Sequence, residues 1–203
     1  MVQSSPSGDV DGWSVVTQGN VPSTAQLQAD NGAGIYAIDS NGETWYFLAP
    51  ADRFSGNLEQ AYNGQLAFNL IHSETPISGQ VKRAPDVILE AKCGHSIQLF
   101  DFAGSGGQLS ISLNEDSGWI DSRTKRPPSA MDMLGVLSNL AALKIRGGFY
   151  NGREVTSLDS ISITMGLPWF PCCTIDGTVD ICAKPPSTYY SPPNLKFYCE
   201  GHL

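Results

Sequence analysis

The chain has 203 residues, enough for one large all-β domain and a short appendix, and a β-sandwich of that size folds without needing a metal. Its 20 acidic and 12 basic residues give a net charge of -8, which disfavours nucleic acid as a partner because an acidic surface repels phosphate. No apolar run approaches the roughly 18 residues of a membrane span, and residues 1–12 lack the apolar stretch of a secretory signal, so we expect an intracellular protein or a mature or excised fragment.

From Trp13 to Thr164 the dominant hydrophobic period is two. Alternation of this kind places one face of each strand in a core and the other in water, as antiparallel sheets require. The alternating runs are 66–70, 87–89, 97–99, 109–113 and 161–163. Asn-Gly and Gly-rich turn signals separate them, and helical crossovers are missing. The pattern therefore predicts an all-β fold, a two-sheet antiparallel β-sandwich.

One stretch departs from this period. Ser129 is suited to cap a helix, with Asp132 three residues later as a capping-box partner, and Pro127-Pro128 fits the helix entry. Apolar residues then recur at helical spacing, at Met133, Val136, Leu137 and Leu140. The sequence predicts one short helix that packs against an end or an edge of the sandwich.

The composition changes after Met165. Six prolines between positions 168 and 193 are incompatible with a regular central strand. We therefore predict a sandwich over residues 1–165, followed by an irregular, cysteine-tied tail over residues 166–203.

The cysteines favour disulfides. Their spacing does not match a zinc site, and a short segment without a core is the kind that disulfides stabilise. The candidates in the tail, whose pairing the sequence leaves open, are Cys172, Cys173, Cys182 and Cys199. An odd total leaves one cysteine free or bonded to another chain, and we expect it to be the isolated Cys93.

Several blocks of sequence, taken in order, resemble the laminin IV type A domain of extracellular matrix proteins. An aromatic strand ends in Ala49-Pro50, a Phe-x-Gly-Asn turn follows, and a Tyr-x-Gly turn opens the next strand. The blocks are 45–50, 54–57, 61–70, 136–150 and 158–162, with Asp11-Gly12-Trp13 where the family begins. The resemblance implies a jelly-roll-like sandwich, akin to carbohydrate-binding modules, in a large extracellular protein.

Motifs for catalysis are lacking. The sequence has no G-x-S-x-G nucleophile elbow, and a nucleophile would have only His72, His95 and His202 to supply an imidazole base. A glycosidase needs two carboxylates at a fixed separation, and nothing fixes a pair among the acidic residues. We expect no enzyme, and a glycosidase-like hydrolase is the least supported alternative.

Two short acidic motifs have the alternating oxygen ligands of a structural calcium site. They are Asp9-x-Asp11 and Asp39-x-Asn41. Calcium would be the one cofactor of this chain. Solvated Asx turns explain the same residues, and that interpretation is the favoured one.

Aromatic residues are the candidates for ligand contact. Trp45, Tyr46 and Phe47 are consecutive, so at least one ring of a strand there faces away from the core. The binding candidates are Tyr46, Trp119, Tyr189 and Tyr190, although for Trp119 an anchor in the core or at its rim is the favoured interpretation.

These observations lead to one functional expectation. We expect a non-catalytic extracellular structural module that contributes to a matrix-like or filamentous assembly, with other extracellular proteins or its own copies as partners. The alternative is a carbohydrate-binding module of jelly-roll type, whose partners are glycans.

Overall fold

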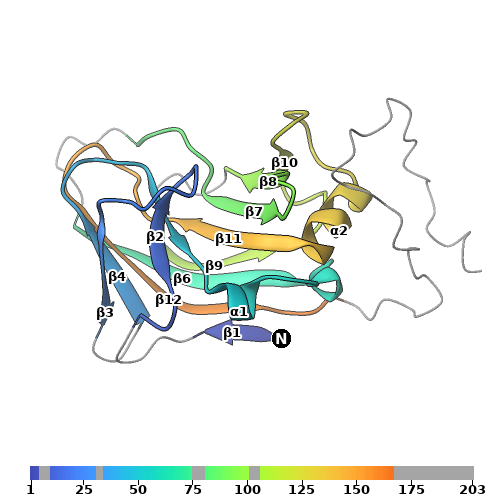
Figure 1. The fold of residues 1–203 in the computed structure, drawn as a ribbon, viewed down its shortest axis with the longest axis horizontal. Helices are drawn as coiled ribbons and strands as arrows, with labels where there is room; N and C mark the ends of the chain where they lie inside the picture. Colours follow the sequence, from blue (N-terminus) through green and yellow to red (C-terminus); the bar gives the residue numbers. More distant parts are fainter. Residues whose placement is uncertain (5–9, 31–33, 75–80, 101–105, 167–203) are drawn as a thin grey trace, which may run out of the picture.

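The structure, a computed structural model, describes residues 1–4, 10–30, 34–74, 81–100 and 106–166 (Figure 1). In these residues the strands form two antiparallel sheets that pack face to face, as the alternating pattern predicts. The predicted tail lies outside the described residues beyond Gly166. No helix in the described part of the chain is long and apolar enough to span a membrane.

The first sheet, called sheet A, has the order β3-β4-β12-β6-β9, with β1 also paired to β12. Its strands are β1 (Val2–Ser4), β3 (Gln26–Asp30), β4 (Gly34–Asp39), β6 (Gln65–Glu74), β9 (Gly107–Ser112) and β12 (Glu154–Ile163). The pairing of β12 with β6 shifts register between Asp159 and Ser162, where Ser160 has a φ of 55°. This bulge separates the part of β12 that pairs with β4 from the part that pairs with β1.

The second sheet, called sheet B, has the order β10-β8-β7-β11-β5-β2. Its strands are β2 (Ser14–Thr17), β5 (Trp45–Leu48), β7 (Val87–Ala91), β8 (Ser96–Leu99), β10 (Ile120–Asp121) and β11 (Leu140–Arg146). The laminin-like blocks at 45–50 and 136–150 therefore supply two adjacent central strands, β5 and β11, which pair antiparallel.

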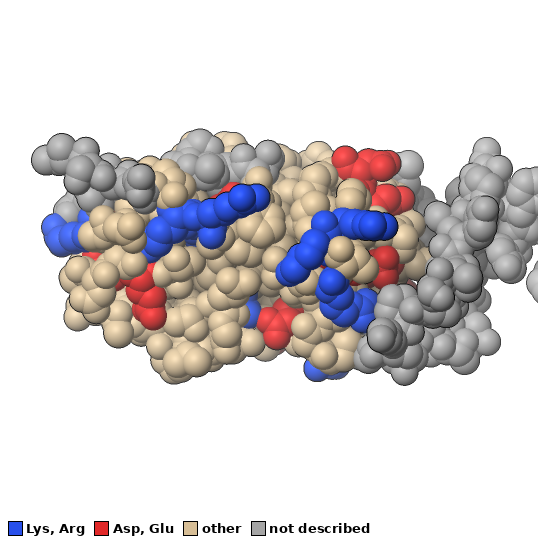
Figure 2. Space-filling model, turned by 90° about the horizontal axis from the view of Figure 1, so that it is seen from above, with Lys and Arg blue, Asp and Glu red and all other residues tan. Residues whose placement is uncertain are grey.

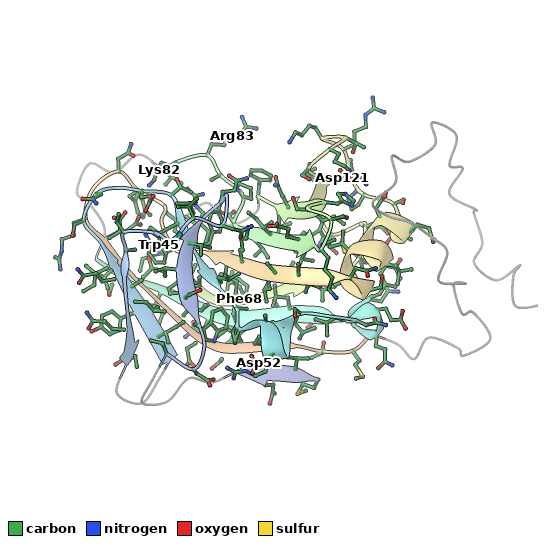
Figure 3. All side chains as sticks on the ribbon, viewed as in Figure 1. Trp45, Asp52, Phe68, Lys82, Arg83 and Asp121 are labelled. Carbon is green, nitrogen blue, oxygen red and sulfur yellow. The ribbon has the colours of Figure 1, made fainter. Side chains whose placement is uncertain are left out.

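The core lies between the two sheets. Leu66, Phe68 and Leu70 of β6 are fully buried and belong to one cluster with Leu143 and Ile145 of β11, and Figure 3 shows Phe68 in this interior. Burial of each such side chain stabilises the fold by about 1.5–3 kcal/mol. Alternation along the strands thus does produce a single core, as the period-two runs predict.

The predicted helix is α2 (Ala130–Ser138), and it packs at one end of the sandwich against β7 and β8. The Ser129 hydroxyl accepts a hydrogen bond from the Asp132 amide at 3.2 Å, and the Ser129 amide donates to the Asp132 carboxylate at 2.9 Å. This capping box satisfies amides that the first turn leaves unpaired. The sequence does not predict two further turns, α1 (Ala51–Phe54) and η1 (Glu59–Ala61).

Gly147 and Gly148 follow β11 because the Trp45 ring lies against the backbone there. A Cβ on Gly147 would stand 2.1 Å from two ring carbons of Trp45, and a Cβ on Gly148 would stand 2.5 Å from the Glu43 carbonyl oxygen. No side chain fits at either position. The Gly-Gly pair of the laminin-like block is thus a packing requirement of the buried tryptophan.

Candidate interaction surfaces

The outer face of sheet B is closed to solvent around Lys144 and Arg146 of its central strand β11. On β11, Lys144 points away from the core, yet its side chain is only 1% exposed. Its ammonium donates to Glu90 Oε2 at 2.6 Å and to the Gln18 carbonyl at 3.0 Å. The Gln18 contact, together with a hydrogen bond from Asn20 to Glu90, holds the loop after β2 over this face.

Arg146 closes the same face nearer the other end of β11. Its guanidinium pairs with Asp86 at 3.3 Å and donates to the carbonyls of Lys82 at 2.6 Å, Ala84 at 3.2 Å and Gly148 at 2.9 Å. Every one of these partners is preorganised, which is the condition for burying a guanidinium. Residues 82–86 are therefore tied across the sheet.

Two predicted binding aromatics are buried, and for them the expectation of ligand contact is wrong. Tyr46 is 0% exposed and packs with Val16 of β2 and Ile88 of β7, and this burial raises its pKa. Trp119 is also 0% exposed, and its indole donates to the Ser112 carbonyl at 2.8 Å, so it anchors the core. Tyr189 and Tyr190 lie outside the described residues.

The calcium candidates have other partners in the structure. An Asp11 carboxylate oxygen lies 2.5 Å from the Arg53 guanidinium. Both Asp39 oxygens accept backbone amides, from Asn41 at 2.8 Å and from Glu43 at 2.9 Å, which is an Asx-type turn. Asp9 lies outside the described residues, and within those residues no group of three or more His, Cys, Asp or Glu is placed to hold a metal. Calcium binding stays a prediction.

Three acidic residues that a glycosidase could use by type make separate structural contacts. Glu90 pairs with Lys144, and Glu115 accepts a hydrogen bond from the Tyr62 hydroxyl at 2.6 Å. Glu154 is fully buried and accepts the Phe149 amide at 3.0 Å, and burial raises its pKa to about 7 against the opposing effect of that amide. Each carboxylate thus orders a different part of the fold.

The sequence interpretation missed one pair, His95 and Asp121. Nε2 of His95 lies 2.9 Å from Asp121 Oδ2, and both side chains are 2% exposed. Burial opposes ionisation of Asp121, but the Arg123 and Thr124 amides and His95 hold its pKa below the usual value. The pair fastens the exposed turn at 122–126 to β8.

Cys93 differs from the sequence expectation. It lies in the exposed turn between β7 and β8 and is disulfide-bonded, so it is not a free thiol. A turn position of this kind projects a cysteine away from the sheet, where another cysteine can reach it. The other four cysteines lie outside the described residues.

Sheet A presents an open outer face. Alternation directs mainly uncharged polar side chains outward from its strands, together with the carboxylates Asp30 and Asp159 and the 49% exposed Ile71. The uncharged polar residues are Gln26, Gln28, Tyr36, Gln65, Asn69, Gln108, Ser110 and Ser157. Neighbouring strands join through them: Tyr36 donates to Gln28 at 2.6 Å and Ser110 donates to Gln65 at 3.0 Å. On the sheet-B side, Figure 2 shows Lys and Arg interspersed with Asp and Glu.

The exposed basic residues of the sheet-B side lie in loops. Arg83 is exposed in the segment over sheet B, as Figure 3 shows, and Arg123, Lys125 and Arg126 are exposed in the turn after β10. This turn is a short basic cluster in an exposed loop.

The comparison with protein families decides the identity. The model of laminin B (domain IV) matches residues 46–168 of the 203-residue chain. The chain belongs to the laminin B (domain IV) family. The resemblance to the laminin IV type A domain that the sequence blocks suggest is thereby confirmed.

Solved structures agree on the fold of this laminin B (domain IV) chain. The L4b domain of human laminin alpha-2 superposes with a TM-score of 0.64 and 16% sequence identity, over 81% of this chain and 97% of that chain. At this identity the likeness concerns the fold alone. A family 11 carbohydrate-binding module from Clostridium thermocellum covers 80% of this chain and 96% of its own at 11% identity, but its TM-score of 0.36 supports no conclusion.

Proposed function

We propose that this laminin B (domain IV) chain is a non-catalytic extracellular module that contributes to a matrix-like assembly through protein–protein contacts. Membership of the laminin family supports the extracellular setting and the structural role. The observation that carries the proposal is the asymmetry of the two sheets. The centre of sheet B is covered by its own loops, whereas sheet A leaves an outer face of mainly uncharged polar side chains open to a partner.

The sealed sheet supports a rigid scaffold. Lys144 and Arg146 lie on the same strand and fasten two separate loops through charge-assisted hydrogen bonds. A buried cation held by several hydrogen bonds and a carboxylate resists displacement, because removing the carboxylate leaves a charge without compensation. A module built in this way holds its open face in a fixed geometry, which lowers the entropy cost of binding.

The contacts of the acidic residues and histidines support the non-catalytic part. His95 and Glu154 are buried at structural junctions, and Glu90 is held by Lys144. A general acid or base needs access to the proton that it transfers. We infer that residues held by these contacts stabilise the fold.

The proposal is tested by immobilising the full chain on a biosensor and presenting purified extracellular matrix proteins. The matched variants are Asn69→Arg on the outer face of sheet A and Arg83→Glu on the sheet-B side. We expect saturable binding of at least one matrix protein, lost in Asn69→Arg and kept in Arg83→Glu. Absence of binding, or loss only in Arg83→Glu, would overturn the proposal.

Carbohydrate binding is the second candidate, and Tyr36 is the observation in its favour. Its half-exposed ring lies on the open face of sheet A beside Gln28, an amide that would accept or donate to sugar hydroxyls. A glycan array with the folded chain tests this function. Binding that Tyr36→Ala removes would support it, and a blank array would reject it.

A further inference from the structure

Both edges of sheet B are covered by the chain itself. Alongside β2, the Thr17 amide donates to the Val21 carbonyl at 2.8 Å and the Ser23 amide donates to the Val15 carbonyl at 3.1 Å. Beside β10, the Asp121 amide donates to the Arg126 carbonyl at 2.8 Å. Local segments of this kind occupy the backbone groups that another chain would otherwise pair with.

In the described part of the chain, β9 of sheet A pairs with β6 alone, and another part of the chain contacts its outer edge at the last residue, Ser112. The Leu113 amide donates toward β6, to the Gly64 carbonyl at 2.9 Å, whereas the Ser112 carbonyl accepts from Trp119 on the opposite side. Backbone direction alternates along a strand, so Gln108 and Ser110 turn their amides and carbonyls away from β6.

The sequence of β9 contains none of the devices that protect edge strands. Gly107–Ser112 has no charged residue and no proline, and its pairing with β6 runs without a register shift. Leu109 is only half-buried at this rim, although its side chain faces the core side of the sheet. Among the described residues, the edge from Gly107 to Ser110 thus offers a partner strand an apolar side chain and backbone groups that β6 does not use.

We propose that β9 pairs antiparallel with β9 of a second copy of this chain, so that sheet A continues across a two-fold axis at Leu109. This inference rests on the proposed function and names its partner as the chain itself. In that register Gln108 lies opposite Ser110 of the second copy, which forms about four backbone hydrogen bonds. The two Leu109 side chains meet at the axis and cover one another.

A second copy fits this edge because a two-fold axis at Leu109 places Leu109 opposite Leu109 and Gln108 opposite Ser110. With no charge on β9, self-pairing sets no like charges opposite each other. The other rim of sheet A, β3, ends in the charged Asp30. The contact is small, so it favours copies that an assembly already holds close together, where the effective concentration is high.

The test is sedimentation velocity of the full chain from micromolar to millimolar concentration, with three double variants of exposed side chains. Gln108→Lys with Ser110→Lys sets two like-charge pairs across the axis, and we expect it to raise the dimer dissociation constant about tenfold. Gln108→Lys with Ser110→Glu sets opposite charges in the same positions, and we expect dimerisation at least as tight as in the native chain. Gln26→Lys with Gln28→Lys on β3 is the matched control and leaves the constant unchanged.

Three results would overturn the inference. They are a native chain that stays monomeric at every concentration, a Lys/Glu variant weakened as much as the Lys/Lys variant, and an effect confined to the β3 control. Each leaves the proposed function standing, because binding of matrix proteins to the biosensor is measured on its own. Circular dichroism of each variant verifies the fold, since all four positions are exposed.

Discussion

Lys144 Nζ lies 2.6 Å from Glu90 Oε2 on the outer face of sheet B, where the lysine side chain is 1% exposed and the glutamate side chain 21% exposed. Without this carboxylate the lysine would be a buried charge with no counter-charge, whereas the carboxylate without the lysine would still be partly reached by water. Glu90→Gln should lower the free energy of unfolding by about 3 kcal/mol, because it leaves a buried ammonium without a counter-charge. In urea unfolding, Glu90→Gln combined with Lys144→Met should be more stable than Glu90→Gln alone. Strict additivity would contradict the coupling.

Arg146 cannot be replaced by lysine without loss. An ammonium has a single nitrogen and cannot reach Asp86 and the carbonyls of Lys82, Ala84 and Gly148 together. Arg146→Lys should lower the free energy of unfolding by about 3 kcal/mol. The exposed Arg83→Lys serves as the control and should change it by less than about 0.5 kcal/mol. Equal effects in the two variants would show that the Arg146 hydrogen-bond network does not stabilise the fold.

Glu154 makes stability depend on pH. Its pKa is raised by burial to about 7, so between roughly pH 4.5 and 7 the folded chain binds more protons than the unfolded chain. Stability from this residue is fully present below pH 4.5 and falls as the pH rises through 7, by as much as about 3 kcal/mol. Thermal melts of Glu154→Gln should lack this decline relative to the native chain. Parallel pH profiles would contradict the assignment.

Cys93 gives a prediction that thiol counting can check. Because it is disulfide-bonded, Cys93→Ser releases its partner. Alkylation of the denatured, unreduced chain should therefore label one more thiol than in the native chain, and the melting temperature should fall. A count lower by one would mean that Cys93 is a free thiol and carries no bond. Ser96→Ala, in the adjoining strand, is a control that should leave the count as it is.

The elements of the fold were predictable where a local pattern carries them. Alternation at 66–70 yields β6, and the Ser129 and Asp132 capping box yields α2. Both signals depend on neighbours within a few residues. For the same reason the short α1 was missed, since four residues after Pro50 carry no helical period.

The surfaces were less predictable because they depend on contacts between distant residues. Alternation correctly directs Tyr46 away from the core. The pattern does not reveal the loops that Lys144 and Arg146 hold over the outer face of sheet B. His95 and Asp121 meet across 26 positions. The open β9 edge follows from strand order, which no single strand of the sequence encodes.

The most direct test of the central claim, that sheet A is the side through which this module binds, is hydrogen–deuterium exchange of the full chain with and without a bound matrix protein. We expect slower exchange in sheet A, in β6, β9 and β12, and unchanged exchange in the loops over sheet B at 18–24 and 82–86. Slower exchange confined to those two loops would contradict the claim and place the partner on the sheet-B side.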